Sequence, residues 1–328
     1  MNHRELTNRE LSSHSMAFHQ IPIIDIEPLL NGSNPEGVAR EIGEVCENIG
    51  FMYIKNHGVS ESLIANAYQQ AAAFFALPQA EKERLNITHS GQTLRGYIPK
   101  YGENVDPEYS RDLKECFDLG QPGHVVSPFF GPNPVPRQLP NFEATFNAYQ
   151  QAMLQLAKRL AGAIALSLDL PVDYFTAQQQ QPITIQRLLH YPPQKGKVSL
   201  EEMGIGAHTD YGFLTILSQD DNGGLQVQNS DGDWVDAPPI PGTFVVNIGD
   251  LVQTLTNDRY LSTMHRVINT TGKERYSLPF FLDMDFDAVV EPVPTCVTPE
   301  NPARYTAYKC GEHKYQRFKA SYAHLQNT

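Results

Sequence analysis

The segment Gly206-Ala207-His208-Thr209-Asp210-Tyr211 pairs a histidine with an aspartate two positions further on. On an extended strand, residues i and i+2 project to the same face, so His208 and Asp210 can reach one metal ion together. The pair is weak evidence alone, because a surface His beside a turn-capping Asp is a plain alternative. Its meaning depends on the sequence around it.

The C-terminal half of the chain consists of short apolar stretches separated by turns. Two segments, Asp221-Asn222-Gly223-Gly224 and Ser230-Asp231-Gly232-Asp233, carry residues typical of hairpin turns. The expected strands cover residues 183–191, 213–218, 225–228, 243–248, 263–269 and 276–282. Many short strands at near-even spacing predict an antiparallel barrel or a double-sheet jelly roll, not a βαβ fold.

The N-terminal half shows helical periodicity. Asn34 as N-cap and Pro35 at the first helical position predict a helix that Gly50 ends. A strand is expected at 51–55, and further helices after the Ser60 cap and over residues 142–168. We expect this helical half to pack on the β-rich half and to share its core.

Composition narrows the functional class. The 328 residues are 41% hydrophobic and carry a net charge of −12, which allows a large core and argues against a nucleic-acid or anionic-membrane partner. No apolar run approaches the roughly 20 residues of a membrane span. The N-terminal residues lack a signal-peptide core, and the four cysteines show no C-x-x-C spacing. We therefore expect a cytoplasmic protein with reduced thiols.

Two later features strengthen the metal-site hypothesis. His265 lies in a strand-like segment, and ten residues further on Arg275 and Ser277 form another i, i+2 pair at the start of an apolar strand. An arginine entering such a strand is costly unless its charge meets a carboxylate. Two His and one Asp on inward faces of a barrel are the ligands of a facial-triad Fe(II) site.

These residues resemble, in order and spacing, the motif of the non-haem iron(II), 2-oxoglutarate-dependent dioxygenases. The segment from Gly50 to Gly58 is similar to the N-terminal signature of the isopenicillin N synthase-like branch, and residues 275–281 resemble isopenicillin N synthase itself. The resemblance implies an α+β, mainly β fold: a distorted double-stranded β-helix (jelly roll) buttressed by helices from the N-terminal half. It divides the chain into a tail (1–20), an N-terminal helical and β region (21–136), a buttressing helix region (137–180), the jelly-roll core (181–285) and a C-terminal extension (286–328).

The resemblance also implies the roles of single residues. His208, Asp210 and His265 would ligate Fe(II), and 2-oxoglutarate would chelate the metal. Its far carboxylate would meet Arg275 in a two-pronged contact, with Ser277 and Tyr191 beside it. Reaction with O2 would release succinate and CO2 while a C–H bond of a small molecule is oxidised. We expect a monomer or weak homo-oligomer.

Two other functions stay open at this stage. Isopenicillin N synthase uses the same metal ligands without 2-oxoglutarate, and Leu189, two residues before Tyr191, resembles it. However, Thr88 stands where that enzyme has an arginine for its charged tripeptide, so we favour the 2-oxoglutarate mode. The second alternative is a catalytically silent binding module, which the intact triad argues against.

Substrate contacts are predicted from the loop-rich segment that covers the pocket in this family. They are Arg95, Tyr97, Tyr101 and Tyr109, with Phe213 and Phe281 as cavity-lining candidates.

Overall fold

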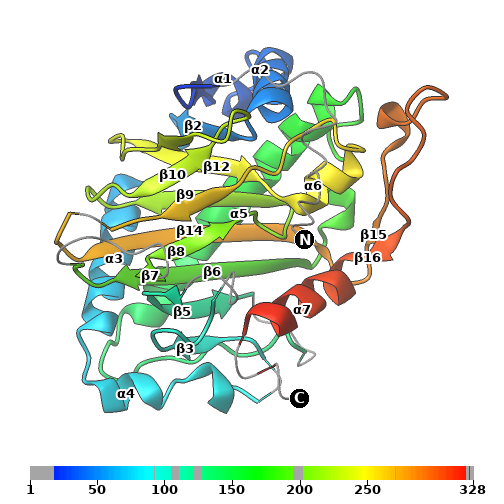
Figure 1. Cartoon of the computed structure of the whole chain (residues 1–328). Helices are drawn as coiled ribbons and strands as arrows, with labels where there is room; N and C mark the ends of the chain where they lie inside the picture. The colour runs from blue at the N-terminus through cyan, green and yellow to red at the C-terminus, as the bar shows by residue number, and fades with distance from the viewer. Residues whose placement is uncertain are drawn as a thin grey trace, which may run out of the picture.

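The computed structural model describes residues 18–91, 93–104, 111–121, 127–194, 202–269, 271–322 and 325. Two β-sheets face each other, and helices cover one side of the larger sheet (Figure 1). The strands are β1 (Ile23–Asp25), β2 (Phe51–Lys55), β3 (Gly96–Ile98), β4 (Arg111–Asp112), β5 (Glu115–Gly120), β6 (Pro182–Tyr191), β7 (Glu202–Met203), β8 (Ile205–His208), β9 (Leu214–Gln219), β10 (Leu225–Gln228), β11 (Trp234–Asp236), β12 (Thr243–Ile248), β13 (His265–Val267), β14 (Arg275–Asp285), β15 (Val289–Val290) and β16 (Tyr308–Lys309).

The helices lie mainly in the N-terminal half. They are α1 (Glu27–Leu30), α2 (Pro35–Asn48), α3 (Glu61–Phe75), α4 (Gln79–Glu83), α5 (Phe142–Ser167), α6 (Asp250–Leu255) and α7 (Cys310–Ser321), with short 3-10 turns η2 (Ile87–His89), η3 (Thr176–Gln178) and η4 (Pro294–Cys296). Asn34 caps α2 as the sequence predicts, since its side chain accepts from the Gly37 backbone N–H. Among the described residues, no helix combines the length and apolar character needed to cross a membrane.

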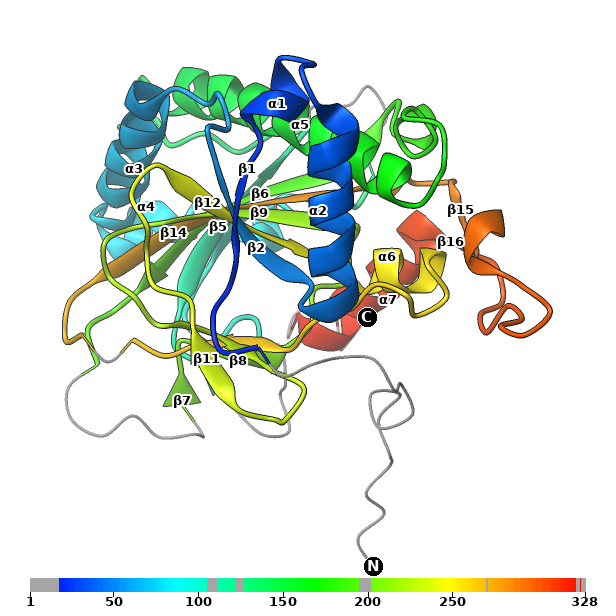
Figure 2. The ribbon, with the colours of Figure 1, turned by 90° about the horizontal axis from the view of Figure 1, so that it is seen from above.

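The larger sheet has eight strands in the order β1-β2-β12-β9-β14-β6-β5-β3, and the smaller has the order β11-β10-β13-β8. Strands distant in sequence are therefore neighbours, as a jelly roll requires. Figure 2, the view from above, shows α2, α3 and α5 on one side of the larger sheet and β8 and β11 on the other. This arrangement confirms the predicted jelly-roll core with buttressing helices.

The larger sheet separates two regions of core. Side chains alternate along β6, so Leu188 packs with the helices and Leu189 faces the smaller sheet. On the helix side, α5 buries residues such as Phe146, Met153 and Leu160. The side facing the smaller sheet is less uniformly apolar, because it also carries buried charged groups.

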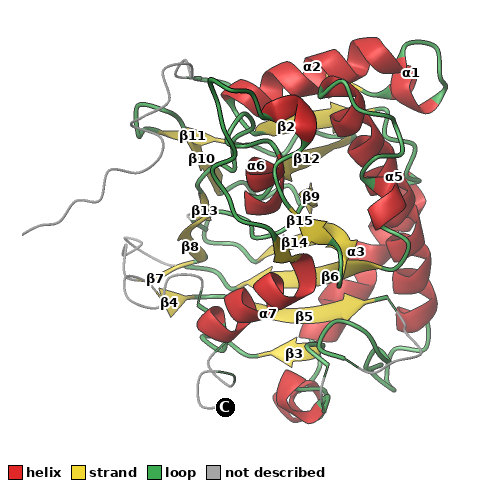
Figure 3. Ribbon diagram, turned by 90° about the vertical axis from the view of Figure 1, so that its right-hand side faces the viewer, coloured by secondary structure: helices red, strands yellow, loops and turns green. Residues whose placement is uncertain are grey.

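The C-terminal helix α7 closes one end of the space between the sheets. Its Lys314 forms an ion pair with Asp283 of β14, and Figure 3 shows α7 alongside β5, β6 and β14.

All four cysteines (Cys46, Cys116, Cys296 and Cys310) are buried, free thiols.

Candidate active site

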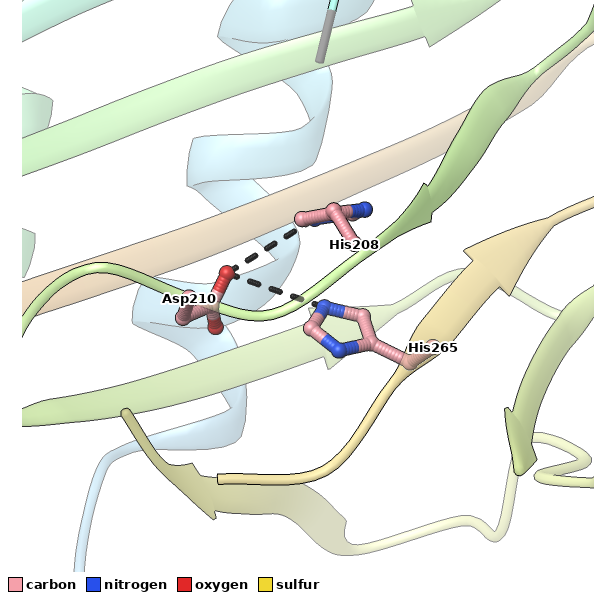
Figure 4. Close-up of side chains that lie close together, drawn as sticks. All are labelled: His208, Asp210 and His265. Carbon is pink, nitrogen blue, oxygen red and sulfur yellow. Dashed lines mark ion pairs between the residues drawn. The ribbon is translucent and has the colours of Figure 1, made fainter. Parts of the chain in front are cut away.

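The metal-site candidates converge at the smaller sheet. His208 ends β8, Asp210 follows in the loop before β9, and His265 begins β13. His265 pairs directly with His208 across the two antiparallel strands, which places the two imidazoles side by side. The nitrogen and oxygen atoms offered by the three residues lie within 4.8 Å of one another. Figure 4 shows both imidazoles turned toward the Asp210 carboxylate.

Backbone carbonyls orient the two imidazoles. His208 Nδ1 lies 2.8 Å from the Gly206 carbonyl oxygen, and His265 Nδ1 lies 3.1 Å from that of Thr263. Because a carbonyl can only accept, each Nδ1 must donate, and each Nε2 is then the nitrogen that can face a metal ion. Burial, together with the neighbouring His265, lowers the pKa of His208 to about 4, so it is neutral at pH 7.

The Asp210 carboxylate is fixed through one of its oxygens. Oδ2 accepts hydrogen bonds from Thr215 Oγ1 at 2.6 Å and from Asn247 Nδ2 at 2.8 Å. Oδ1 faces the histidines, at 3.7 Å from His208 Nε2 and 3.6 Å from His265 Nε2. These separations are too long for hydrogen bonds and leave space for an ion between the three atoms.

The donor set therefore fits Fe(II). Two neutral imidazoles and one carboxylate on one side of an ion form the 2-His-1-carboxylate triad and leave the other coordination positions open. Partners outside the triad already orient all three ligands, as in other metal sites.

Arg275, Ser277 and Tyr191 form a second polar group in the same cavity. The Arg275 side chain is fully buried, and its Nη1 lies 3.4 Å from Ser277 Oγ. Its Cζ lies 4.7 Å from the centroid of the Tyr191 ring, and β14 and β6 place these two residues directly opposite each other.

The rest of the Arg275 guanidinium is held by neutral acceptors. Its Nε donates to the carbonyls of Asn222 and Gly223, and its Nη2 donates to Gln219 Oε1. In the described part of the chain no carboxylate forms an ion pair with Arg275, as expected for a group that receives an anionic ligand.

One cavity holds the triad and the arginine group together. Phe51, Leu225 and Val267 supply part of its apolar lining. Phe281, one of the predicted substrate contacts, also lines it. The cavity is thus a mainly apolar chamber with a few polar groups, as small-molecule sites usually are.

The other predicted substrate contacts do not line this cavity. Arg95 is buried and donates to the backbone carbonyls of Gly131, Gln121 and Phe129, which gives it a structural role. Tyr97 lies among the residues on the helix side of the sheet, where its hydroxyl donates to Glu115 at 2.6 Å.

Three further candidates have different positions. Phe213 is buried against Phe175 with 5.1 Å between ring centroids, so its role is packing. Tyr101 stacks under the Arg111 guanidinium at 4.2 Å, outside the cavity lining. Tyr109 lies outside the described residues.

Sequence reasoning missed four charged residues that line the cavity: Glu103, Lys114, Arg187 and Lys314. Arg187 occupies an inward position of β6, four residues before Tyr191 and therefore on the same face. This spacing from Tyr191 is the sequence signal that could have identified Arg187 as a cavity residue. The partners could not be read from the sequence, because Glu103 and Arg187 are 84 positions apart.

Comparisons with known proteins agree with this geometry. The family model described as "2OG-Fe(II) oxygenase superfamily" matches residues 182–284. The family model described as "non-haem dioxygenase in morphine synthesis N-terminal" matches residues 21–138. A homoarginine-6-hydroxylase of Oryza sativa subsp. japonica is 36% identical over 324 residues, covering 92% of this chain and 97% of that protein. A 1-aminocyclopropane-1-carboxylate oxidase of Dictyostelium discoideum is 34% identical, covering 84% and 85%.

Solved structures give the same result. Neurospora crassa T7H in complex with alpha-KG and thymine superimposes with a TM-score of 0.84 at 30% identity, covering 92% of this chain and 96% of that chain. JOX2 in complex with 2OG, Fe and JA gives a TM-score of 0.76 at 28% identity, covering 100% and 94%.

The chain belongs to the 2OG-Fe(II) oxygenase superfamily. It is an enzyme that depends on Fe(II) and 2-oxoglutarate and acts on small molecules. This finding favours the predicted 2-oxoglutarate mode over the synthase-like oxidase and over the silent binding module.

Proposed function

We propose that His208, Asp210 and His265 bind Fe(II), and that Arg275, Ser277 and Tyr191 bind the far carboxylate of 2-oxoglutarate. The observation that carries this proposal is that both groups line one cavity, with the triad atoms within 4.8 Å of one another. The bound iron would supply the activation of O2 that couples decarboxylation of 2-oxoglutarate to oxidation of a substrate C–H bond.

The residues of the chain have three tasks in this proposal. The triad holds the metal on one side and leaves the opposite positions to ligands. Arg275, planar and two-pronged, fixes the orientation of 2-oxoglutarate through charge-assisted hydrogen bonds, and Ser277 adds a hydroxyl donor. The apolar lining, including Phe51 and Val267, excludes water from the reacting groups.

The first substrates to test come from the relatives. The name of the Oryza sativa protein contains homoarginine, and that of the Dictyostelium discoideum protein contains 1-aminocyclopropane-1-carboxylate. Both compounds are amino acids. We propose that this enzyme oxidises a small polar molecule of comparable size.

The test separates metal binding from turnover. Anaerobic addition of Fe(II) and 2-oxoglutarate should produce a weak visible charge-transfer band, and addition of O2 should then yield succinate. The band should be absent in His208→Ala and retained in His89→Ala, an exposed histidine that serves as the control. A band of equal strength in His208→Ala would contradict the proposed ligand set.

A further inference from the structure

A group of buried charges borders the cavity beside the triad. Glu103, Lys114 and Arg187 line the cavity, and Asp112 and Asp118 lie directly behind them. We call these five residues the charged wall. All five residues are at most 8% exposed.

The two cations of the charged wall are fully engaged by its carboxylates. Arg187 binds Asp118 through two parallel contacts of 2.7 Å and reaches Glu103 at 2.8 Å. Lys114 Nζ lies 2.7 Å from Asp112 and 3.3 Å from Glu103. An incoming anion would have to displace these partners and would meet the charge of Glu103.

Within the charged wall, Glu103 is the carboxylate that lines the cavity, and it retains capacity to accept. Its Oε2 meets both Lys114 and Arg187, whereas among the described residues Oε1 meets only Arg187 Nη1, at 3.1 Å. An ionised carboxylate offers about four lone-pair sites, so a further donor can bind Oε1 from the cavity. Burial opposes ionisation, but Arg187 and Lys114 outweigh it and lower the pKa of Glu103 to about 2.

The charged wall carries a surplus of negative charge, with three carboxylates against two cations. The other buried pair beside the cavity, Lys314 with Asp283, is neutral as a whole. Tyr322, which donates to Asp118, has its pKa raised by burial and stays uncharged. Arg317 on α7 does not offset the surplus, because it is exposed to solvent and its guanidinium stacks on the Tyr211 ring at 4.2 Å.

Among the described residues, the charges in the rest of the cavity are balanced once the proposed cofactors are bound. The two positive charges of Fe(II) and that of Arg275 offset Asp210 and the two carboxylates of 2-oxoglutarate. A buried uncompensated charge is costly, so a cationic group beside Glu103 would complete the balance.

We infer that the substrate carries a positively charged nitrogen group, an amine or guanidinium, which donates a hydrogen bond to Glu103 on the charged wall. This inference rests on the proposed function, since it takes the triad as the reacting centre. The positive group then anchors the substrate on the β5 and β6 side while an adjacent C–H bond faces the triad. Neutral heterocycles and simple carboxylates are disfavoured.

The test compares two compounds that differ in charge and hardly in shape. Homoarginine carries a guanidinium at the end of its side chain, and homocitrulline carries a neutral urea there. The α-ammonium and α-carboxylate, whose charges cancel, are the same in both, so only the charge of the chain end differs. We expect homoarginine, and other compounds ending in an amine or guanidinium, to perturb the charge-transfer band of the anaerobic Fe(II)–2-oxoglutarate complex. We expect homocitrulline, thymine and indole-3-acetate to perturb it at least about tenfold more weakly, the range of a lost charge-assisted hydrogen bond.

The variant Glu103→Gln should abolish this preference, so that cationic and neutral partners bind within about threefold of each other. The control is Glu115→Gln on the helix side of β5. Glu115 is also buried and paired, with Lys82 at 2.7 Å, but it does not line the cavity. It should therefore lose comparable stability and keep the preference for cations.

The outcomes separate the two proposals. A missing band in the wild type would contradict the proposed function. A normal band that no cationic compound perturbs at millimolar concentration, or that neutral or anionic compounds perturb more strongly, overturns the inference and leaves the proposed function intact. Equal loss of the cation preference in Glu115→Gln also overturns it, because the effect would then be structural.

Discussion

At the scale of the residue, Arg275 is the group whose chemistry admits the least substitution. Its guanidinium touches Ser277 and stacks on Tyr191 while Nε stays bound to backbone carbonyls. A lysine offers a single ammonium group and cannot make the two parallel hydrogen bonds of a guanidinium. We predict that Arg275→Lys raises the KM for 2-oxoglutarate at least about tenfold. Succinate formation at varied co-substrate concentration measures this, with Fe(II) affinity as the control that should not change.

The hydrogen bonds to Asp210 give a second prediction. Thr215→Val keeps the side-chain shape but removes the 2.6 Å bond to Asp210 Oδ2. Loss of such a supporting contact typically costs about 10- to 100-fold in metal affinity. Anaerobic Fe(II) titration should show this loss. The same substitution at Thr184, which is buried on the helix side of β6, should leave Fe(II) affinity unchanged. Equal losses in both variants would show that the effect is structural and does not come from the lost hydrogen bond to Asp210 Oδ2.

At the scale of the element, the long helix α5 supports the site without touching it. Met153 is fully buried on the face of α5 that packs on the sheet. We predict that Met153→Ala lowers the free energy of unfolding by about 2–5 kcal/mol, through lost burial and a cavity. Urea unfolding measures this. Gln155→Ala on the exposed face should change little. The KM for 2-oxoglutarate should not change in either variant, and a changed value would show that α5 controls the cavity.

Elements with regular apolar patterns were predictable from the sequence. The strands expected at 225–228 and 243–248 coincide with β10 and β12, and the helix expected at 142–168 is α5. β5 was not located individually, because residues 88–135 predicted only loops with short strands. Its polar residues Glu115 and Asp118 are buried because distant cations neutralise them. Local periodicity cannot reveal such partners, which is also why the charged wall was missed although the three triad residues were named.

At the scale of the whole molecule, buried carboxylates set the response to acid. Burial raises the pKa values of Glu103 and Glu115, but their cationic and hydrogen-bonding partners outweigh it and lower both to about 2. A carboxylate with a lowered pKa in the folded state stabilises the fold above its ordinary value and loses that contribution as the pH falls. The pKa of an unperturbed Glu is about 4.5.

We therefore predict that the free energy of unfolding falls steeply as the pH is lowered from about 4.5 toward 2. Urea unfolding at a series of pH values measures it. Glu115→Gln should flatten this part of the curve, because one of the two carboxylates no longer takes up a proton on unfolding. An unchanged slope in that variant would show that Glu115 does not contribute.

The four buried thiols allow local opening of the protein to be measured by thiol alkylation. Burial raises the pKa of Cys46, Cys116 and Cys310, so little reactive thiolate exists in the closed protein. Because Cys46 packs with the helices and Cys116 with the opposite core, alkylation of each sulfur records the opening of a different region. Mass spectrometry of time-resolved labelling would thus show which half of the molecule loosens first, without any introduced probe.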